Sequence, residues 1–213
     1  MSASLTGDEL LSQLTALPPH LRDGALERLL GISGLVDPTP PGRELVGYHP
    51  SGLAPVLTAL LETRLGPEDV FVDLGAGLGK VTSLVRLLSG AQVRGIELQA
   101  CLVERAPRLE GIELVLGDAR VAPFDDGTVF FLYNPFEGGV LSEVLERLHR
   151  VAQHHAIVVC ALGLALGHCS WLRARPLDHF WLTVLDSVVP GRPPRRPASR
   201  IYDPRVRQLA EER

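Results

Sequence analysis

The sequence contains little cysteine and few aromatic residues. Its three cysteines, Cys101, Cys160 and Cys169, include no CxxC pair. This pattern excludes a disulfide-dense secreted scaffold and a structural zinc module. We therefore predict no metal site and a reducing, cytoplasmic environment.

Long hydrophobic runs and an excess of positive charge are also absent. No stretch approaches about 18 uninterrupted apolar residues, and the first residues lack a basic segment followed by an apolar run. We expect neither a membrane span nor a signal peptide. The formal net charge is -4, so the overall balance does not indicate nucleic acid or an anionic membrane as a partner.

Lysine is nearly missing: Lys80 is the only one, and the other basic side chains are arginines. With the high content of Ala, Gly, Pro and Leu, we interpret this as a coding bias rather than a binding surface. We expect Lys80 to be a solvated residue in the first turn of a helix.

The most informative stretch runs from Val70 to Lys80. Residues 70–74 form an apolar run interrupted only by Asp73, which predicts a buried strand. Three glycines at alternate positions follow, and helical apolar spacing then continues to Gly90. A strand, a glycine turn and a helix in succession place a ligand against a helix N-terminus.

The spacing of these glycines separates two ligand classes. A dinucleotide fingerprint, G-x-G-x-x-G, would need its third glycine where Lys80 stands. The pattern Asp73-x-Gly75-x-Gly77-x-Gly79 instead resembles motif I of the class I S-adenosylmethionine-dependent methyltransferases. A tight strand-helix connection without any ligand is the alternative.

Acidic residues follow the next two predicted strands. Glu97 ends the strand 92–98, about 20 residues after the glycine turn, where a carboxylate can accept both hydroxyls of a ribose, with Leu98 beside the adenine. Asp118 and Ala119 follow the strand 112–116 and resemble motif III of the same family. That resemblance implies that Asp118 meets the adenine amino group.

The fourth predicted strand, 128–133, ends in Tyr133, Asn134, Pro135 and Phe136. This resembles the family's motif IV, at the mouth where the methyl group is transferred. Relatives that methylate amines carry Asn/Asp-Pro-Pro-aromatic there, and one proline is missing here. We propose Asn134 and Tyr133 as catalytic candidates and favour an amine acceptor slightly. Because side chains alternate along a strand, we expect only one of the two to face the acceptor.

The segment from Tyr48 to Ser51 precedes a predicted helix capped by Ser51. An aromatic residue followed by Pro and Ser/Thr at this place resembles bacterial relatives of the non-SET histone lysine methyltransferases, where the segment lies near the methionine end of the cofactor. The resemblance adds Tyr48 to the predicted cofactor-binding residues, which are Tyr48, Asp73, Gly75, Ala76, Gly77, Gly79, Glu97, Leu98, Asp118, Ala119 and Asn134.

Strands alternating with helices predict an α/β fold with a doubly wound, mostly parallel seven-stranded sheet. We expect the sixth strand near residues 179–185 and the seventh near 200–202. A helix is expected within 98–109, ending at or near Pro107, and a proline-rich linker over 36–42. Residues 1–44 are predicted to be a helical extension and possible lid, 45–203 the methyltransferase domain, and 204–213 a charged tail that frays.

The leading hypothesis is an S-adenosylmethionine-dependent methyltransferase acting on a small molecule or a protein side chain. The sequence leaves two alternatives open. One is a catalytically silent protein that binds the cofactor as a regulatory or partner subunit. The other, less favoured, is an NAD(P)-dependent oxidoreductase. The sequence does not determine the oligomeric state.

Overall fold

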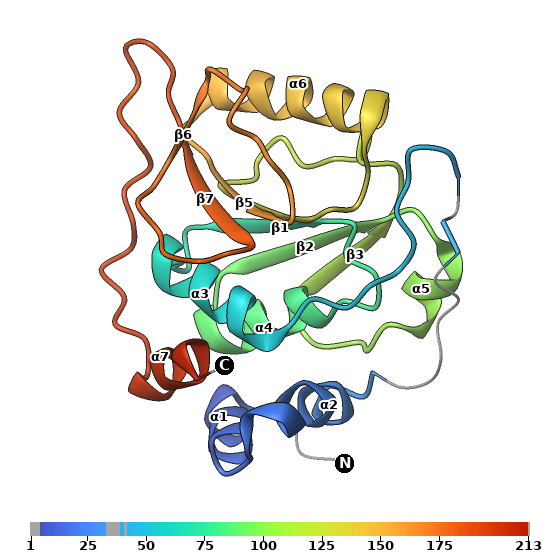
Figure 1. Cartoon of the computed structure of the whole chain (residues 1–213), viewed down its shortest axis with the longest axis vertical. Helices are drawn as coiled ribbons and strands as arrows, with labels where there is room; N and C mark the ends of the chain where they lie inside the picture. The colour runs from blue at the N-terminus through green and yellow to red at the C-terminus, as the bar shows by residue number, and fades with distance from the viewer. Residues whose placement is uncertain (1–4, 33–38, 41, 213) are drawn as a thin grey trace.

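The computed structural model describes residues 5–32, 39–40 and 42–212. Within this part of the chain, seven strands form one sheet in the order β3-β2-β1-β4-β5-β7-β6 (Figure 1). The strands are β1 (Val70–Leu74), β2 (Gln92–Glu97), β3 (Ile112–Leu116), β4 (Val129–Tyr133), β5 (Val158–Leu162), β6 (Leu172–Ala174) and β7 (Leu182–Ser187). The first five are parallel, and β7 is antiparallel to both β5 and β6. The predicted doubly wound α/β fold is confirmed.

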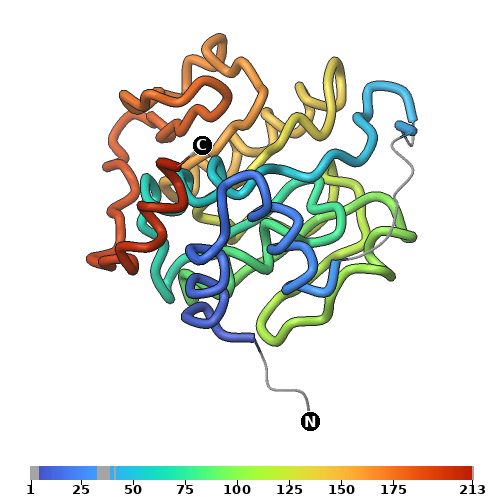
Figure 2. The backbone as a smooth tube through the Cα atoms, turned by 60° about the horizontal axis from the view of Figure 1, so that its bottom comes forward, coloured from blue at the N-terminus to red at the C-terminus, as the bar shows by residue number. Residues whose placement is uncertain are grey.

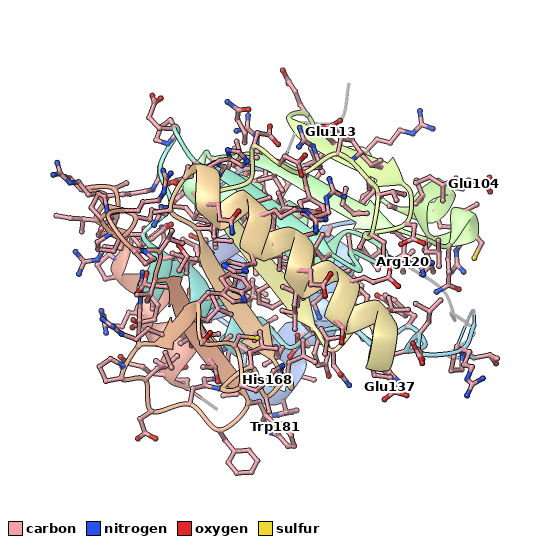
Figure 3. The ribbon with its side chains drawn as sticks, turned by 90° about the horizontal axis from the view of Figure 1, so that it is seen from above. Glu104, Glu113, Arg120, Glu137, His168 and Trp181 are labelled. Carbon is pink, nitrogen blue, oxygen red and sulfur yellow. The ribbon has the colours of Figure 1, made fainter. Side chains whose placement is uncertain are left out.

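Helices cover both faces of this sheet (Figure 1). They are α1 (Gly7–Thr15), α2 (Pro19–Leu29), α3 (Leu53–Thr63), α4 (Lys80–Ser89), α5 (Ala100–Arg105), α6 (Gly138–His154) and α7 (Pro204–Glu211). The sheet face that packs with α3 and α4 and the face that packs with α6 have separate hydrophobic clusters. Figure 3 shows α6 lying across its face, with Glu137 at its start. Since both faces are covered, β4 and β5 are almost continuously apolar and buried.

The N-terminal helices α1 and α2 and the C-terminal helix α7 lie together outside α3 and α4 (Figure 2). A capping box begins α1: the Thr6 hydroxyl accepts from Glu9 N, and the Glu9 carboxylate accepts from Thr6 N. Leu10, Leu14 and Leu26 are fully buried in the cluster that includes α3 and α4. The helical extension is therefore part of the main hydrophobic core.

The prediction of a fraying C-terminal tail is wrong. Residues 204–211 form α7, whose N-terminus is capped by the Asp203 carboxylate accepting from Arg205 N. Val206, Leu209 and Ala210 are buried against the rest of the chain. Their helical spacing gives one apolar face, and this face offsets the entropy lost on ordering the charged segment.

Other predicted boundaries also differ. Residues 200–202 are not a strand; the additional strand is β6, and β7 begins at Leu182. The helix predicted to end at or near Pro107 ends at Arg105, close to the predicted place, but it begins at Ala100 rather than at residue 98. The prolines of the predicted linker 36–42 fall largely outside the described residues. No helix in the described part of the chain is long and apolar enough to cross a membrane.

Candidate functional site

One pocket opens at the carboxyl ends of β1, β2 and β4, where ligands bind in open parallel sheets. It holds about 1090 Å³ of empty space including its open mouth, enough for a nucleoside carrying an amino acid. The predicted residues that line it are Tyr48, Asp73, Gly75, Ala76, Gly77, Glu97, Leu98, Asp118, Ala119, Tyr133 and Asn134. Gly79 lies outside the lining and forms the left-handed N-cap of α4.

The glycine turn brings the backbone into close contact with two other pocket segments. Gly75 and Gly77 have φ values of +88° and +56°, in the left-handed region that favours glycine. A Cβ on Gly75 would lie 2.5 Å from Pro135 Cβ, and a Cβ on Gly77 would lie 2.5 Å from Tyr48 Cε2. These two positions therefore require glycine for both conformation and space.

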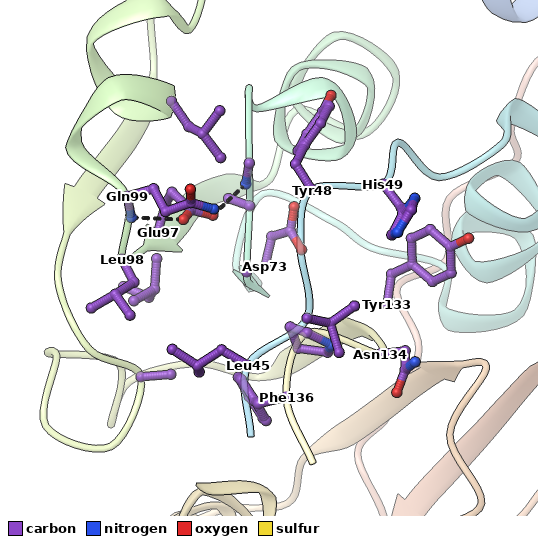
Figure 4. Close-up of a pocket in the computed structure, with 18 of the residues that line it drawn as sticks. Leu45, Tyr48, His49, Asp73, Glu97, Leu98, Gln99, Tyr133, Asn134 and Phe136 are labelled. Atoms are coloured by element: carbon purple, nitrogen blue, oxygen red, sulfur yellow. Dashed lines mark hydrogen bonds between the residues drawn. The ribbon is translucent and has the colours of Figure 1, made fainter. Parts of the chain in front are cut away.

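The Glu97 carboxylate is buried and held by backbone amides at the end of β2. Its Oε2 accepts from Gly77 N and its Oε1 from Gln99 N, each at 2.8 Å (Figure 4). Each carboxylate oxygen can accept a further hydrogen bond. The glycine turn thus orients an acceptor pair of the kind that binds adjacent hydroxyl groups.

Asp73 lies at the end of β1 and is only 3 % exposed. Burial, and secondly the negative charge of Glu97, raise the pKa of Asp73 to about 8. No residue in the described part of the chain donates a hydrogen bond to its carboxyl group. Asp73 is therefore mostly protonated at neutral pH, and a cation placed beside it would favour the ionised form.

Asp118 is paired with its neighbour Arg120 on the pocket rim. Arg120 donates to both carboxylate oxygens, at 2.6 Å from Nη2 to Oδ2 and 2.9 Å from its backbone N to Oδ1. These hydrogen bonds lower the pKa of Asp118. The predicted adenine contact must therefore use the remaining lone pairs or the adjacent backbone of Ala119. Nowhere in the described residues do three or more His, Cys, Asp or Glu side chains gather to hold a metal ion.

A strap formed by residues 44–51 closes the pocket on the side of β4. Leu45 forms an antiparallel bridge with Phe136, and Val46 N donates to Pro135 O. The Glu44 carboxylate accepts from Gly139 N at 2.9 Å and caps the N-terminus of α6. No local pattern signals this cap, because the two residues are 95 positions apart.

Tyr133 and Asn134 both line the pocket, and which of them faces the acceptor stays a prediction. Tyr133 ends β4, whereas Asn134 lies beyond the strand with φ +38°, where the alternation no longer applies. Figure 4 shows Glu97 and Leu98 on one side of Asp73, and Tyr133 and Asn134 on the other, with His49 next to the Tyr133 ring. One end of the pocket therefore carries the Glu97 carboxylate, and the other end carries the Tyr133 hydroxyl and the Asn134 amide.

The expectation that Lys80 is solvated is wrong. Lys80 lines the pocket and is 5 % exposed. Its Nζ donates to Asp23 Oδ1 at 2.9 Å and to Glu27 Oε1 at 3.0 Å, both on α2. Burial of a lysine requires such partners, and these lie more than 50 positions away in the sequence.

No protein-family model matches the sequence, and no curated protein matches it. Solved structures share its fold. A single-residue mutant of MtNAS in complex with S-adenosylmethionine is 14% identical, covers 86% of this chain and 72% of its own, and has a TM-score of 0.51. MtNAS in complex with MTA and tNA gives the same identity and TM-score over 70% of its chain.

An RNA methyltransferase from Salinibacter ruber, in complex with S-adenosyl-L-homocysteine, is 23% identical and has a TM-score of 0.49. The match covers 71% of this chain and all of that one. The strand order, the antiparallel β7 and the flanking helices are those of the class I methyltransferase fold.

Proposed function

We propose that this chain is an S-adenosylmethionine-dependent methyltransferase. The observation that carries the proposal is the carboxylate of Glu97, held by amide groups of Gly77 and Gln99 inside the pocket. This arrangement fixes two acceptor oxygens at the tip of the strand next to the glycine turn, which suits the hydroxyls of a ribose.

The other lining residues would each contact a different part of the cofactor. Leu98 and Ala119, with Asp118 on the rim, would hold the adenine. The glycine turn and Tyr48 would meet the amino-acid end, and Asp73 would face positive charge. The MtNAS mutant crystallised with S-adenosylmethionine shares this fold and lends support to the choice of cofactor.

The bound cofactor would supply an electrophilic methyl group on a sulfonium, and its transfer is an in-line displacement. The chain must align the acceptor and exclude water. Tyr133 and Asn134, our catalytic candidates, lie at the pocket end away from Glu97 (Figure 4). The Asn134 amide oxygen could accept a hydrogen bond from an acceptor nitrogen and so direct its lone pair.

For the acceptor, we propose a small molecule or a protein side chain, with an amine slightly favoured. The segment at Tyr48 resembles bacterial relatives of the non-SET histone lysine methyltransferases, and on that resemblance we propose a role in a bacterial cytoplasm. A silent cofactor-binding subunit is the second candidate, because cofactor residues alone do not transfer a methyl group. A nicotinamide-dependent oxidoreductase is the third and least favoured candidate, because Lys80 stands where the dinucleotide fingerprint G-x-G-x-x-G has its third glycine.

Two experiments separate these candidates. Calorimetry with S-adenosylhomocysteine, NAD and NADP should show binding of the first alone, and binding of only a nicotinamide nucleotide would reject the methyltransferase. Mass spectrometry should then detect a methyl increment on an amine, phenol or protein acceptor incubated with S-adenosylmethionine. Cofactor binding with no increment across a broad panel would favour the silent subunit.

A further inference from the structure

Helix α2 contributes two carboxylates that pair with a pocket-lining residue, Lys80. Asp23 and Glu27, one helical turn apart, both pair with Lys80, the first residue of α4. Asp23 Oδ1 also accepts from Leu53 N at 2.9 Å, the first amide of α3. The Asp23 carboxylate therefore contacts the first residue of α3 and the first residue of α4.

These carboxylates act on the pocket interior. Lys80, which Asp23 and Glu27 hold, is itself part of the pocket lining. Glu27 and Glu97 together add to the effect of burial in raising the pKa of the Tyr48 hydroxyl to about 12, while Arg105 opposes them. Tyr48 lies against Gly77 in the glycine turn, so negative charge from α2 reaches the amino-acid end of the site.

The charges of this cluster do not cancel. Two carboxylates, Asp23 and Glu27, face one ammonium, that of Lys80, which leaves one negative charge. Glu97 adds a second, fixed by the glycine turn. Asp73, which feels the charge of Glu97, also lines the pocket with its carboxyl group buried and without a hydrogen-bond donor from the described residues. The site is built to receive a cation.

We propose that the Asp23-Glu27-Lys80 cluster makes the pocket discriminate by charge, so that it binds the sulfonium cofactor more tightly than the neutral thioether left after methyl transfer. The inference rests on the proposed function. S-adenosylmethionine carries one more positive charge than S-adenosylhomocysteine, and transfer of the methyl group removes that charge. Release of the product is thereby favoured, and α2 takes part in specificity as well as in packing.

The test compares cationic and neutral ligands by calorimetry. Sinefungin, a stable analogue with an amine in place of the methylsulfonium, serves beside S-adenosylmethionine as the cationic probe. Glu27→Gln removes one negative charge while Lys80 keeps Asp23 as its partner. We expect about a fivefold loss of affinity for the cationic ligands, with little change for S-adenosylhomocysteine. Lys80→Gln should change the ratio of the two affinities in the opposite direction.

The matched control is Glu113→Gln on β3, which removes a carboxylate whose partner is Arg94, outside the pocket. It should leave both affinities unchanged. In the unaltered protein, raising the ionic strength should reduce the preference for the cationic ligands. Equal losses for cationic and neutral ligands in Glu27→Gln would assign the cluster a purely structural role and overturn the inference, while the proposed function would stand. Failure of the unaltered protein to bind any of these ligands would reject both.

Discussion

Tyr48 and Gly77 are in direct contact: a Cβ added to Gly77 would come within 2.5 Å of Tyr48 Cε2. The contact joins the strap to the glycine turn, although the two residues lie on opposite sides of α3 and β1 in the sequence. The end of the pocket that we propose for the amino-acid part of the cofactor therefore requires glycine at position 77.

Gly77→Ala should weaken binding of S-adenosylhomocysteine at least tenfold, because the strap or the turn must move to relieve the clash. The positive φ adds a cost of about 1 kcal/mol. Gly191→Ala is the matched control: Gly191 has φ +76°, but its added Cβ would meet nothing within 4 Å. Calorimetry and thermal unfolding of both variants separate the two causes, and equal affinities in the two would show that the contact with Tyr48 is irrelevant to binding.

Glu97→Ala should reduce affinity for S-adenosylhomocysteine at least tenfold and leave the fold intact. Hydrogen bonds to a charged group each contribute about 1.5 to 3 kcal/mol, and the substitution removes the acceptor pair. Glu113→Ala, at an exposed carboxylate on the neighbouring strand, is the control. Circular dichroism checks the fold, and unchanged affinity would remove Glu97 from the site.

Asp73 should make stability depend on pH. The unfolded chain releases its proton near pH 4, whereas the folded chain holds it up to about pH 8. The stability linked to this group is therefore fully present below pH 4 and is lost as the pH rises through 8, by at most about 1.4 kcal/mol per pH unit. Denaturant unfolding from pH 5 to 9 should show the unaltered protein losing stability relative to Asp73→Asn. Parallel curves would mean that Asp73 is not protonated in the folded state.

Leu209→Ala should lower the free energy of unfolding by about 2 to 4 kcal/mol, because a fully buried side chain is removed from the core shared by α7 and α3. Arg207→Ala, at an exposed position of the same helix, should change it by less than about 0.5 kcal/mol. Urea denaturation measures both. Similar values for the two variants would show that α7 contributes little to stability.

Asn134→Gly and Asn134→Ala separate the effect of losing the side-chain amide from the effect of straining the backbone at a positive φ. Glycine adopts the observed φ of +38° freely, whereas alanine is strained there by about 1 kcal/mol. If Asn134 aligns the acceptor, both variants should lose methyl transfer by a much larger factor than they lose affinity for S-adenosylhomocysteine, to which Asn134 is also predicted to contribute. Methyl transfer preserved in Asn134→Gly would exclude the amide from the reaction.

Much of the sheet and of the pocket could be predicted because both depend on local patterns. Parallel strands carry apolar runs, and their carboxyl ends meet at one edge, so Asp73, Glu97 and Asn134 were expected to converge there. The left-handed turns of Gly75 and Gly77 likewise follow from residue type. The orientation of the Glu97 side chain could not be predicted from its own segment, because one of its two amide partners, Gly77 N, belongs to the glycine turn.

What the sequence determined by itself is the order of the elements and the type of residue at each strand end, since these are set by periodicity and by turn chemistry. The tertiary structure alone decided the partners of Lys80, the cap that Glu44 provides for α6, and the burial of α7. Each of these depends on charges or apolar faces that lie far apart in the chain, and no local pattern records which distant group will neutralise or cover another.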